Sequence, residues 1–195
     1  VYAGILQPPL FSLIFPDYFN YAAIGSIIGH EIVHAFDKSG SLLDADGNPR
    51  NWWDDDDKAE YLNKTQCFID QYSGFYLEEV NMTINGTLTV GETLADAVGL
   101  KMSYSAYKEE EKRKGRQPTL PGLDLNQDQL FFLSLAQVWC AKEAPLFVKY
   151  VVLYDNHPPG KFRLIGPLQN SEDFAKAYNC PRGSYMNPEK KCSMW

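Results

Sequence analysis

The amino-acid sequence predicts a mainly α-helical domain spanning residues 1–195, and three observations support this. Apolar residues follow helical spacing over several stretches, the most apolar of which runs from Tyr18 to Phe36. Acidic or capping side chains stand where such stretches begin, and glycines stand where they end. The chain also has no internal repeat and no linker that would separate a second complete domain.

The first 36 residues divide into two parts. Three prolines among residues 1–17 predict an extended, packed segment and not a helix. From Tyr18 to Phe36 the residues are apolar on all sides of a helix, which predicts that this helix is buried. Gly40 lies where it could end the helix.

Two longer helices are predicted in the middle of the chain. The first runs from about Asp54 to Leu77 and begins with four consecutive aspartates. These acids could bind a cation, but the helix dipole also favours carboxylates at an N-terminus, and we prefer that interpretation. The second runs from about Val90 to Lys114, and its charged last turns predict a solvent-exposed face.

The last third of the chain contains shorter elements. Asn126 and Gln129 have capping-box spacing ahead of an apolar helix, and Ser171 is expected to cap the last helix. The expected segments are, in order, a helix over 130–141, an apolar run over 144–153, a loop over 155–160 and a short helix that ends at Tyr178.

The composition excludes several classes of protein. Of the 195 residues, 45% are hydrophobic and 22% are charged, which are globular values and not those of a disordered chain. No apolar run reaches the roughly 18 residues of a membrane span. With 18 basic and 25 acidic side chains the net charge is −7, which argues against broad binding to nucleic acid or anionic lipid.

Potential glycosylation sites suggest an exported protein. Asn63, Asn81 and Asn85 each begin an Asn-x-Thr sequon. The four cysteines lack C-x-x-C spacing, so disulfides are expected rather than a zinc knuckle or a redox pair, and three pairings are open. The alternative is a cytosolic protein with a turn region rich in Thr and Asn and four buried thiols. Because the chain begins at Val1 without a signal peptide, we expect a targeting segment upstream.

The strongest chemical signal is the H-E-x-x-H motif His30-Glu31-Ile32-Val33-His34. Residues four apart lie about 40° apart around a helix axis, so both imidazoles leave the same face. Two ring nitrogens can then bind one Zn²⁺, while Glu31 can reach a water on the metal and accept its proton. The alternative is a pair of core histidines that only make hydrogen bonds. We consider it weak, because burying two His and a Glu on an apolar helix costs free energy that a functional role would explain.

A catalytic zinc needs a third protein ligand. The longer metzincin pattern would require histidine at position 40, where this chain has Gly40. Glu92 is the better candidate, and Asp96, one turn later, could accept the outer N–H of a ligating imidazole. Acid pairs at this spacing are common on exposed helices, but the apolar neighbours of this pair predict burial and hence a partner.

The third histidine lies in the loop over 155–160. Taken alone, His157 would be a surface residue. Beside a zinc site it becomes a candidate donor to the oxyanion of the transition state, with Asp155 as the acid that orients it. Arg163 could hold a peptide carbonyl or carboxylate through its planar guanidinium.

Several motifs together resemble the neprilysin/endothelin-converting-enzyme family of zinc metallopeptidases. The resemblance covers essentially the whole chain and rests on residues 4–9 (GILQPP), 29–37 (GHEIVHAFD), 129–140 (QLFFLSLAQVWC), 160–163 (GKFR) and 192–195 (CSMW). It implies a thermolysin-like (gluzincin) catalytic domain that forms the C-terminal part of a two-lobed enzyme. Where the family usually has Glu-Asn-x-x-Asp, this chain has Thr93 in place of the Asn and keeps both carboxylates.

The resemblance implies a role for each residue of the site. It implies that one zinc ion per chain is bound by His30, His34 and Glu92. The further implied roles are Glu31 as catalytic base, Asp96 as support for His30, His157 as transition-state donor and Arg163 as the residue that holds the substrate backbone. The residues that match the family's apolar S1′ pocket are Ile5, Leu10, Ser26, Ile27, Val138 and Trp139.

The resemblance also implies partners and a compartment. Cys67 and Cys192 are expected to form a disulfide, whereas Cys140 and Cys180 are expected to pair with cysteines of an N-terminal lobe upstream. The strand that grips the substrate is expected upstream as well. The protein is expected to be extracellular, either secreted or as the ectodomain of a type II membrane protein.

The sequence therefore predicts a zinc-dependent endopeptidase that cleaves small extracellular peptides on the amino side of bulky hydrophobic residues. Glu31 is expected to activate a zinc-bound water, which attacks the scissile carbonyl. The alternative is a catalytically inactive, zinc-stabilised ectodomain that binds peptides or protein partners. The presence of Glu31 argues against it, because a binding protein needs no base beside the metal.

Overall fold

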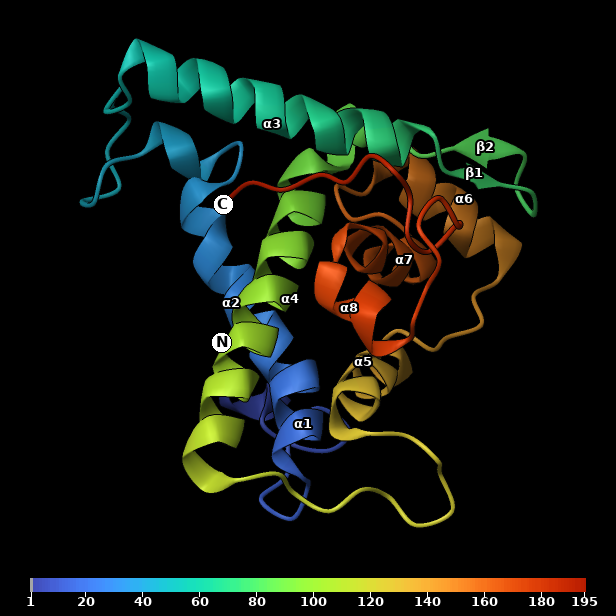
Figure 1. Cartoon of the computed structure of the whole chain (residues 1–195). Coiled ribbons are helices and arrows are strands. Elements are labelled where there is room, and N and C mark those ends of the chain that lie inside the picture. The colour runs from blue at the N-terminus through green and yellow to red at the C-terminus, as the bar shows by residue number, and fades with distance from the viewer. Residues whose placement is uncertain (1) are drawn as a thin grey trace.

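A computed structural model gives the structure of residues 2–195, which is mainly helical as the sequence predicts. The long helix α4 (Gly86–Lys114) runs through the molecule, with α2 (Ser26–Val33) along one side and α3 (Asp55–Ser73) across its N-terminal end (Figure 1). The helices on the other side are α5 (Gln127–Val138), α6 (Pro145–Tyr154), α7 (Gly160–Asn170) and α8 (Glu172–Ala177).

The helical run that carries the H-E-x-x-H motif is continuous, as predicted, but changes its winding. It passes from α1 (Asp17–Asn20) through a π-helical turn (Tyr21–Gly25) into α2, and ends in a 3-10 turn (His34–Phe36). The prediction of burial on all sides was wrong, because α4 covers only one face and Ile28, Ile32 and Phe36 are exposed.

The segment before α1 contains no α-helix within residues 2–16, as the prolines predict. It forms one 3-10 turn, Ala3–Ile5, followed by bends and turns. The expectation that it is packed holds in part, since Leu10, Phe11 and Phe15 are half-buried and Phe15 packs on Phe19, whereas Leu13 and Ile14 are almost fully exposed.

Local capping signals were interpreted correctly. Asp54 Oδ1 accepts the Asp57 N–H at 2.8 Å, so this acid caps α3, whose first turn holds the other aspartates. Asn126 and Gln129 form the predicted capping box, each side chain accepting the other's backbone N–H at 2.9 Å. Ser171 caps α8 by accepting the Phe174 N–H.

The structure contains a hairpin and a helix that were not predicted, and the bounds of two helices differ from the prediction. Helix α3 ends at Ser73, before a short antiparallel hairpin of β1 (Tyr76–Leu77) and β2 (Met82–Thr83), which pairs Tyr76 with Thr83 and Leu77 with Met82. Asn85 then caps α4, which begins four residues earlier than expected. Helix α7 was not predicted, because it follows two prolines and contains Gly166 and Pro167.

Three groups of buried side chains surround α4 and its neighbours. The first joins α1, α4, α5 and α7 through Tyr18, Ala22, Leu100, Tyr107, Leu130, Phe131, Phe132, Leu135 and Leu168. The second joins α2, α3, α4 and the C-terminal tail through Val33, Phe68, Val90, Leu94, Ala95, Val98, Cys192 and Met194. The third joins the end of α3, the hairpin, α6 and α7 through Tyr72, Phe75, Leu77, Ile84, Val148, Val152 and Phe162.

Two glycines bring α2 and α4 into backbone contact. A Cβ atom on Gly29 would lie 2.7 Å from Gly99 O, and one on Gly99 would lie 2.5 Å from His30 N. No larger side chain fits either position without moving a backbone. The contact therefore sets the distance between the helix that carries His30 and the helix that carries Glu92 and Asp96.

A disulfide joins Cys67 on α3 to Cys192 in the C-terminal tail, which confirms the expected pair. Neither Cys140 nor Cys180 is in a disulfide within residues 2–195; Cys140 is exposed. Among these residues, no helix combines the length and apolar character needed to cross a membrane.

Candidate metal centre and active site

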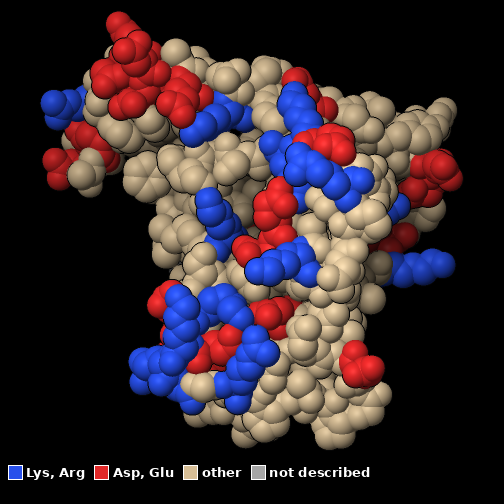
Figure 2. Space-filling model, viewed as in Figure 1, with Lys and Arg blue, Asp and Glu red and all other residues tan. Residues whose placement is uncertain are grey.

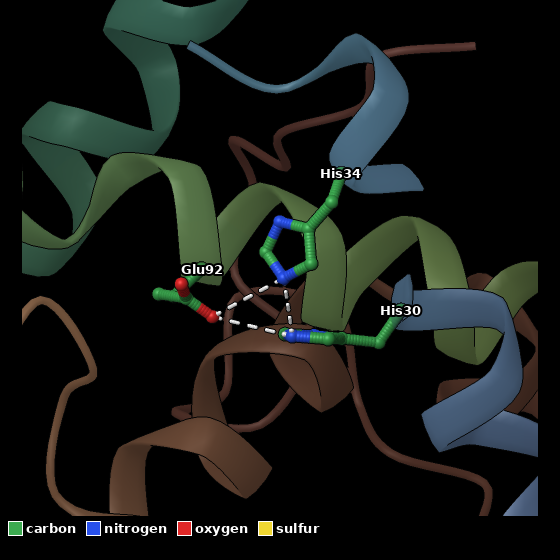
Figure 3. Close-up of side chains that lie close together, drawn as sticks. All are labelled: His30, His34 and Glu92. Carbon is green, nitrogen blue, oxygen red and sulfur yellow. Dashed lines mark hydrogen bonds and ion pairs between the residues drawn. The ribbon is translucent and has the colours of Figure 1, made fainter. Parts of the chain in front are cut away.

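Three side chains from α2, the turn after it and α4 converge on one point. Figure 3 shows His30 and His34 pointing toward Glu92. The two Nε2 atoms are 2.9 Å apart, and Glu92 Oε2 lies 3.2 Å from His30 Nε2 and 3.6 Å from His34 Nε2. Ligands at about 2.0–2.1 Å from a tetrahedral zinc lie about 3.3 Å from one another, so these separations suit one ion.

The outer nitrogens of both imidazoles face carboxylates. His30 Nδ1 lies 2.8 Å from Asp96 Oδ1, and His34 Nδ1 lies 2.6 Å from Asp37 Oδ2. A proton on each Nδ1 leaves the lone pair of Nε2 directed to the centre of the cluster. Within residues 2–195, buried Glu92 Oε2 has no hydrogen-bond donor in good geometry. This donor set and its unpartnered oxygen fit zinc.

The electrostatics of the cluster favour positive charge at its centre. Burial lowers the pKa of His30, but Asp96 and Glu92 outweigh burial and raise that pKa to about 9. Burial raises the pKa of Glu92, but the nearby His30, His157 and His34 lower it overall. A divalent cation would supply the positive charge that both groups favour.

Asp96 connects the metal cluster to Arg163 on α7. Arg163 Nε and Nη2 donate to the two Asp96 oxygens at 2.8 and 2.7 Å, and the guanidinium carbon lies 4.4 Å from the centre of the Trp139 ring. Burial raises the pKa of Asp96, but Arg163 and His30 outweigh it and lower that pKa. Asp96 is therefore an anion held by the guanidinium of Arg163 and facing Nδ1 of His30.

The loop between α6 and α7 approaches the cluster from the other side. Asp155 Oδ1 accepts the backbone N–H of His157 and lies 2.8 Å from its Nδ1, as predicted for an orienting acid. His157 Nε2 lies 3.0 Å from Glu92 Oε2. Asn156, which lies between Asp155 and His157 in the sequence, donates from Nδ2 to Glu92 Oε1 at 2.9 Å.

A cavity of about 190 Å³ opens beside the cluster. Glu31, His157 and Arg163 line it together with His30 and Asp96. The predicted pocket residues Ser26, Ile27 and Trp139 also line it, so the cavity brings together eight of the predicted site residues; the remaining lining is Leu100, Leu135 and Pro167. Ile5, Leu10 and Val138 are not part of this lining and stay predictions.

The sequence did not reveal two of the contacts. Asp37 had a signal, since it follows His34 by three residues and can reach it on a helical turn, and its Oδ1 also accepts the N–H groups of Ser39 and Gly40. Asn156 had no signal, because its contact with Glu92 joins residues 64 apart in the chain.

The predicted glycosylation sites lie on the surface. Asn63 is on α3, Asn81 is in the hairpin turn with a φ of 53°, and Asn85 is the N-cap of α4. All three are exposed, and their modification stays a prediction.

Related proteins share both the sequence and the fold. The chain is 50% identical over 193 residues to "Neprilysin-2" of Caenorhabditis elegans and 45% identical over 194 residues to human "Neprilysin". Both alignments cover 99% of this chain and 26% of the relative. The chain thus spans about a quarter of the length of these relatives.

Solved structures resemble the chain along nearly its whole length. The zinc metalloprotease Zmp1 of Mycobacterium tuberculosis, in complex with inhibitor, superposes with a TM-score of 0.90 at 32% identity, covering 99% of this chain and 30% of Zmp1. PepO of Lactobacillus rhamnosis gives 0.79 at 36% identity, covering 92% of this chain and 26% of PepO. These likenesses confirm the thermolysin-like, gluzincin fold class. The profile of "Peptidase family M13" matches residues 1–194, and the chain therefore belongs to that family, which confirms the resemblance to neprilysins and endothelin-converting enzymes.

Proposed function

We propose that this chain carries the active site of a zinc-dependent endopeptidase that hydrolyses extracellular peptides on the amino side of bulky hydrophobic residues. The observation that supports it most is the donor cluster of His30, His34 and Glu92 with Glu31 lining the cavity beside it. Because the chain spans about a quarter of the length of its relatives, the proposal concerns the reaction of the intact enzyme that contains this site.

His30, His34 and Glu92 would hold the zinc, one ion per chain. When bound, zinc supplies Lewis acidity, which polarises a carbonyl and lowers the pKa of water. Glu31 is exposed and lines the cavity, so it can take a proton from the attacking water while the oxygen bonds to the carbonyl carbon. Glu31 then returns the proton to the leaving nitrogen as the C–N bond breaks.

His157 and Arg163 stand where a bound peptide would need donors. Asp155 accepts a hydrogen bond from the Nδ1–H of His157 and so orients the ring with Nε2 toward the site, where a proton on Nε2 can be donated to the developing oxyanion. Asp96 holds Arg163 through Nε and Nη2, so Nη1 can donate to a substrate carbonyl.

The substrate preference follows from the cavity wall. Ile27, Leu135 and Trp139 form an apolar part of the wall of the cavity that Glu31, His157 and Arg163 also line, and Ser26 lies in the same wall. A bulky hydrophobic side chain removes more apolar surface from water in such a space than a small or polar one does.

The surface chemistry supports an exported protein. The Cys67–Cys192 disulfide belongs to an oxidising compartment, and three exposed sequons add to this. We place the protein outside the cell, either secreted or as a membrane-anchored ectodomain. We assign Cys140 and Cys180 to disulfides with an N-terminal lobe of the same protein.

A conservative change at Glu31 tests the proposal. In the intact enzyme, Glu31→Gln should still bind one zinc but hydrolyse an internally quenched fluorogenic peptide about 10²–10⁴-fold more slowly, since the base is lost and the ligands remain. Zinc is counted by elemental analysis of the same preparations. Glu109→Gln, on the exposed end of α4, is the control and should keep full turnover.

Two results would contradict the assignment. Normal turnover by Glu31→Gln would remove Glu31 as the base. Zinc binding by the unmodified protein without chelator-sensitive hydrolysis of any peptide with a bulky hydrophobic residue would instead identify an inactive, zinc-stabilised binding protein.

A further inference from the structure

The two carboxylate oxygens of Glu92 have different surroundings. Oε2 faces the Nε2 atoms of His30, His34 and His157 at 3.2, 3.6 and 3.0 Å. Oε1 instead accepts the hydrogen bond from Asn156 Nδ2 at 2.9 Å. The Glu92 side chain is 9% exposed, whereas Asn156 is exposed at the rim of the site. One oxygen is therefore held from the surface while the other is directed inward.

This difference matters because a carboxylate can rotate. A free glutamate can offer either oxygen, or both, to a cation, and each alternative arrangement lowers the population of the productive one. A hydrogen bond from a neutral amide to a charged oxygen is stronger than one between neutral groups, and rotation of Glu92 would break it. The amide also holds the oxygen without adding a charge that would compete with the metal.

The loop that carries Asn156 is itself fixed. Asp155 Oδ1 binds both the backbone N–H and the ring of His157, and buried Pro158 and Pro159 lead directly into α7. Asn156 thus projects from a rigid turn, and consecutive residues of that turn hold two different groups. Asp155 holds His157, and Asn156 holds Glu92.

We propose that Asn156 is a positioning residue for the metal site, in which its side-chain amide holds Glu92 Oε1 so that Oε2 alone meets the cation. The inference rests on the proposed zinc site and concerns how tightly the metal is bound, separately from the hydrolytic step.

Zinc titration of the intact enzyme, freed of metal by a chelator, tests this role without any activity assay. Asn156→Leu keeps a side chain of similar size but removes the donor, and we expect the zinc affinity to fall about tenfold in competition with a chromophoric chelator. Gln66→Leu is the matched control, because Gln66 Nε2 makes an exposed amide–carboxylate hydrogen bond to Asp70 on α3, away from the site.

The outcomes separate the two proposals. If the unmodified chain binds one zinc and Asn156→Leu binds it equally well, the positioning role is wrong and the zinc site stands. If the unmodified chain binds no zinc, the proposed function itself fails. Asn156→Ser, whose side chain is too short to reach Glu92, replaces the Leu variant should that variant not fold, with the same tenfold loss expected. The visible spectrum of bound Co²⁺ should change in either variant at position 156 and remain unchanged in Gln66→Leu.

Discussion

The two halves of helix α4 have the same backbone geometry and opposite surroundings. In the first half, residues 86–100, the side chains of Glu92 and Asp96 are buried, and their partners come from α2, α7 and the loop before α7. In the second half, residues 101–114, Glu110 pairs with Arg113 and Lys114 of the same helix. Figure 2 shows Lys and Arg interleaved with acids at this end of the helix, at lower left in the view of Figure 1.

The comparison teaches that a shifted pKa does not by itself mark a functional carboxylate. Exposed Arg113 and Lys114 lower the pKa of half-buried Glu110 to about 2, and Arg163 and His30 lower the pKa of Asp96, whose side chain is buried, as well. What differs is the origin of the partners. Those of Glu110 are local and solvated, whereas those of Asp96, namely His30 and Arg163, are brought from other helices and are themselves largely buried.

The largest effect is expected in the buried half. Asp96→Asn removes the charge that faces His30 Nδ1 and frees Arg163, so zinc affinity should fall about 10–100-fold. The measurement is isothermal titration of the metal-free intact enzyme with zinc. The equivalent change in the exposed half, Glu110→Gln, should leave the affinity unchanged. Equal zinc affinities for Asp96→Asn and Glu110→Gln would show that carboxylates in the two halves of α4 do not differ in their effect on the metal site.

A pair of glycines sharpens the comparison within the buried half. Gly99→Ala places a methyl group 2.5 Å from His30 N, and we expect this overpacking to lower the free energy of unfolding by about 1–3 kcal/mol. Gly91→Ala meets only Asp37 Oδ2 at 3.6 Å, so its better helix propensity should raise stability by up to about 1 kcal/mol. Urea denaturation measures both, and stabilisation by Gly99→Ala would refute the close backbone contact.

The smallest effect is expected at the exposed end. Glu110 has its pKa lowered from 4.5 to about 2, so the stability it contributes is present above pH 4.5 and is lost as the pH falls toward 2. The solvation of its partners Arg113 and Lys114 makes the contribution small, and Glu110→Gln should shift the thermal midpoint by less than about 2 °C at pH 7. The difference between the two proteins should vanish near pH 2. A shift of several degrees at neutral pH would show that this ion pair is not merely a solvated one.

Features with a local cause could be predicted from the sequence. The His30–His34 spacing, the caps at Asp54, Asn126 and Ser171 and the end of α4 at Gly115 each depend on a few adjacent residues. The pairing of Cys67 with Cys192 came from the family resemblance and is confirmed, whereas the cysteine count alone left three pairings open.

Features with a distant cause could not be predicted. Helix α7 contains Gly166 and Pro167, yet it forms because Phe162 is buried and Gly166 packs against the ring of Tyr72 on α3. The contact of Asn156 with Glu92 depends on the meeting of a loop and a helix that are far apart in the chain. The exposed faces of Ile28 and Ile32 show the reverse case, since apolar periodicity does not state which face another element covers.

The backbone contact of Gly29 with Gly99 bears on how the enzyme would respond to scarce metal. Because the two helices are already locked together beside the three donor side chains, assembly of the binding site does not wait for an ion, unlike a zinc finger, which is unfolded without one. Removal of zinc should therefore abolish hydrolysis reversibly while the protein stays folded. Metal supply, and not refolding, would then set how quickly a silenced molecule resumes turnover.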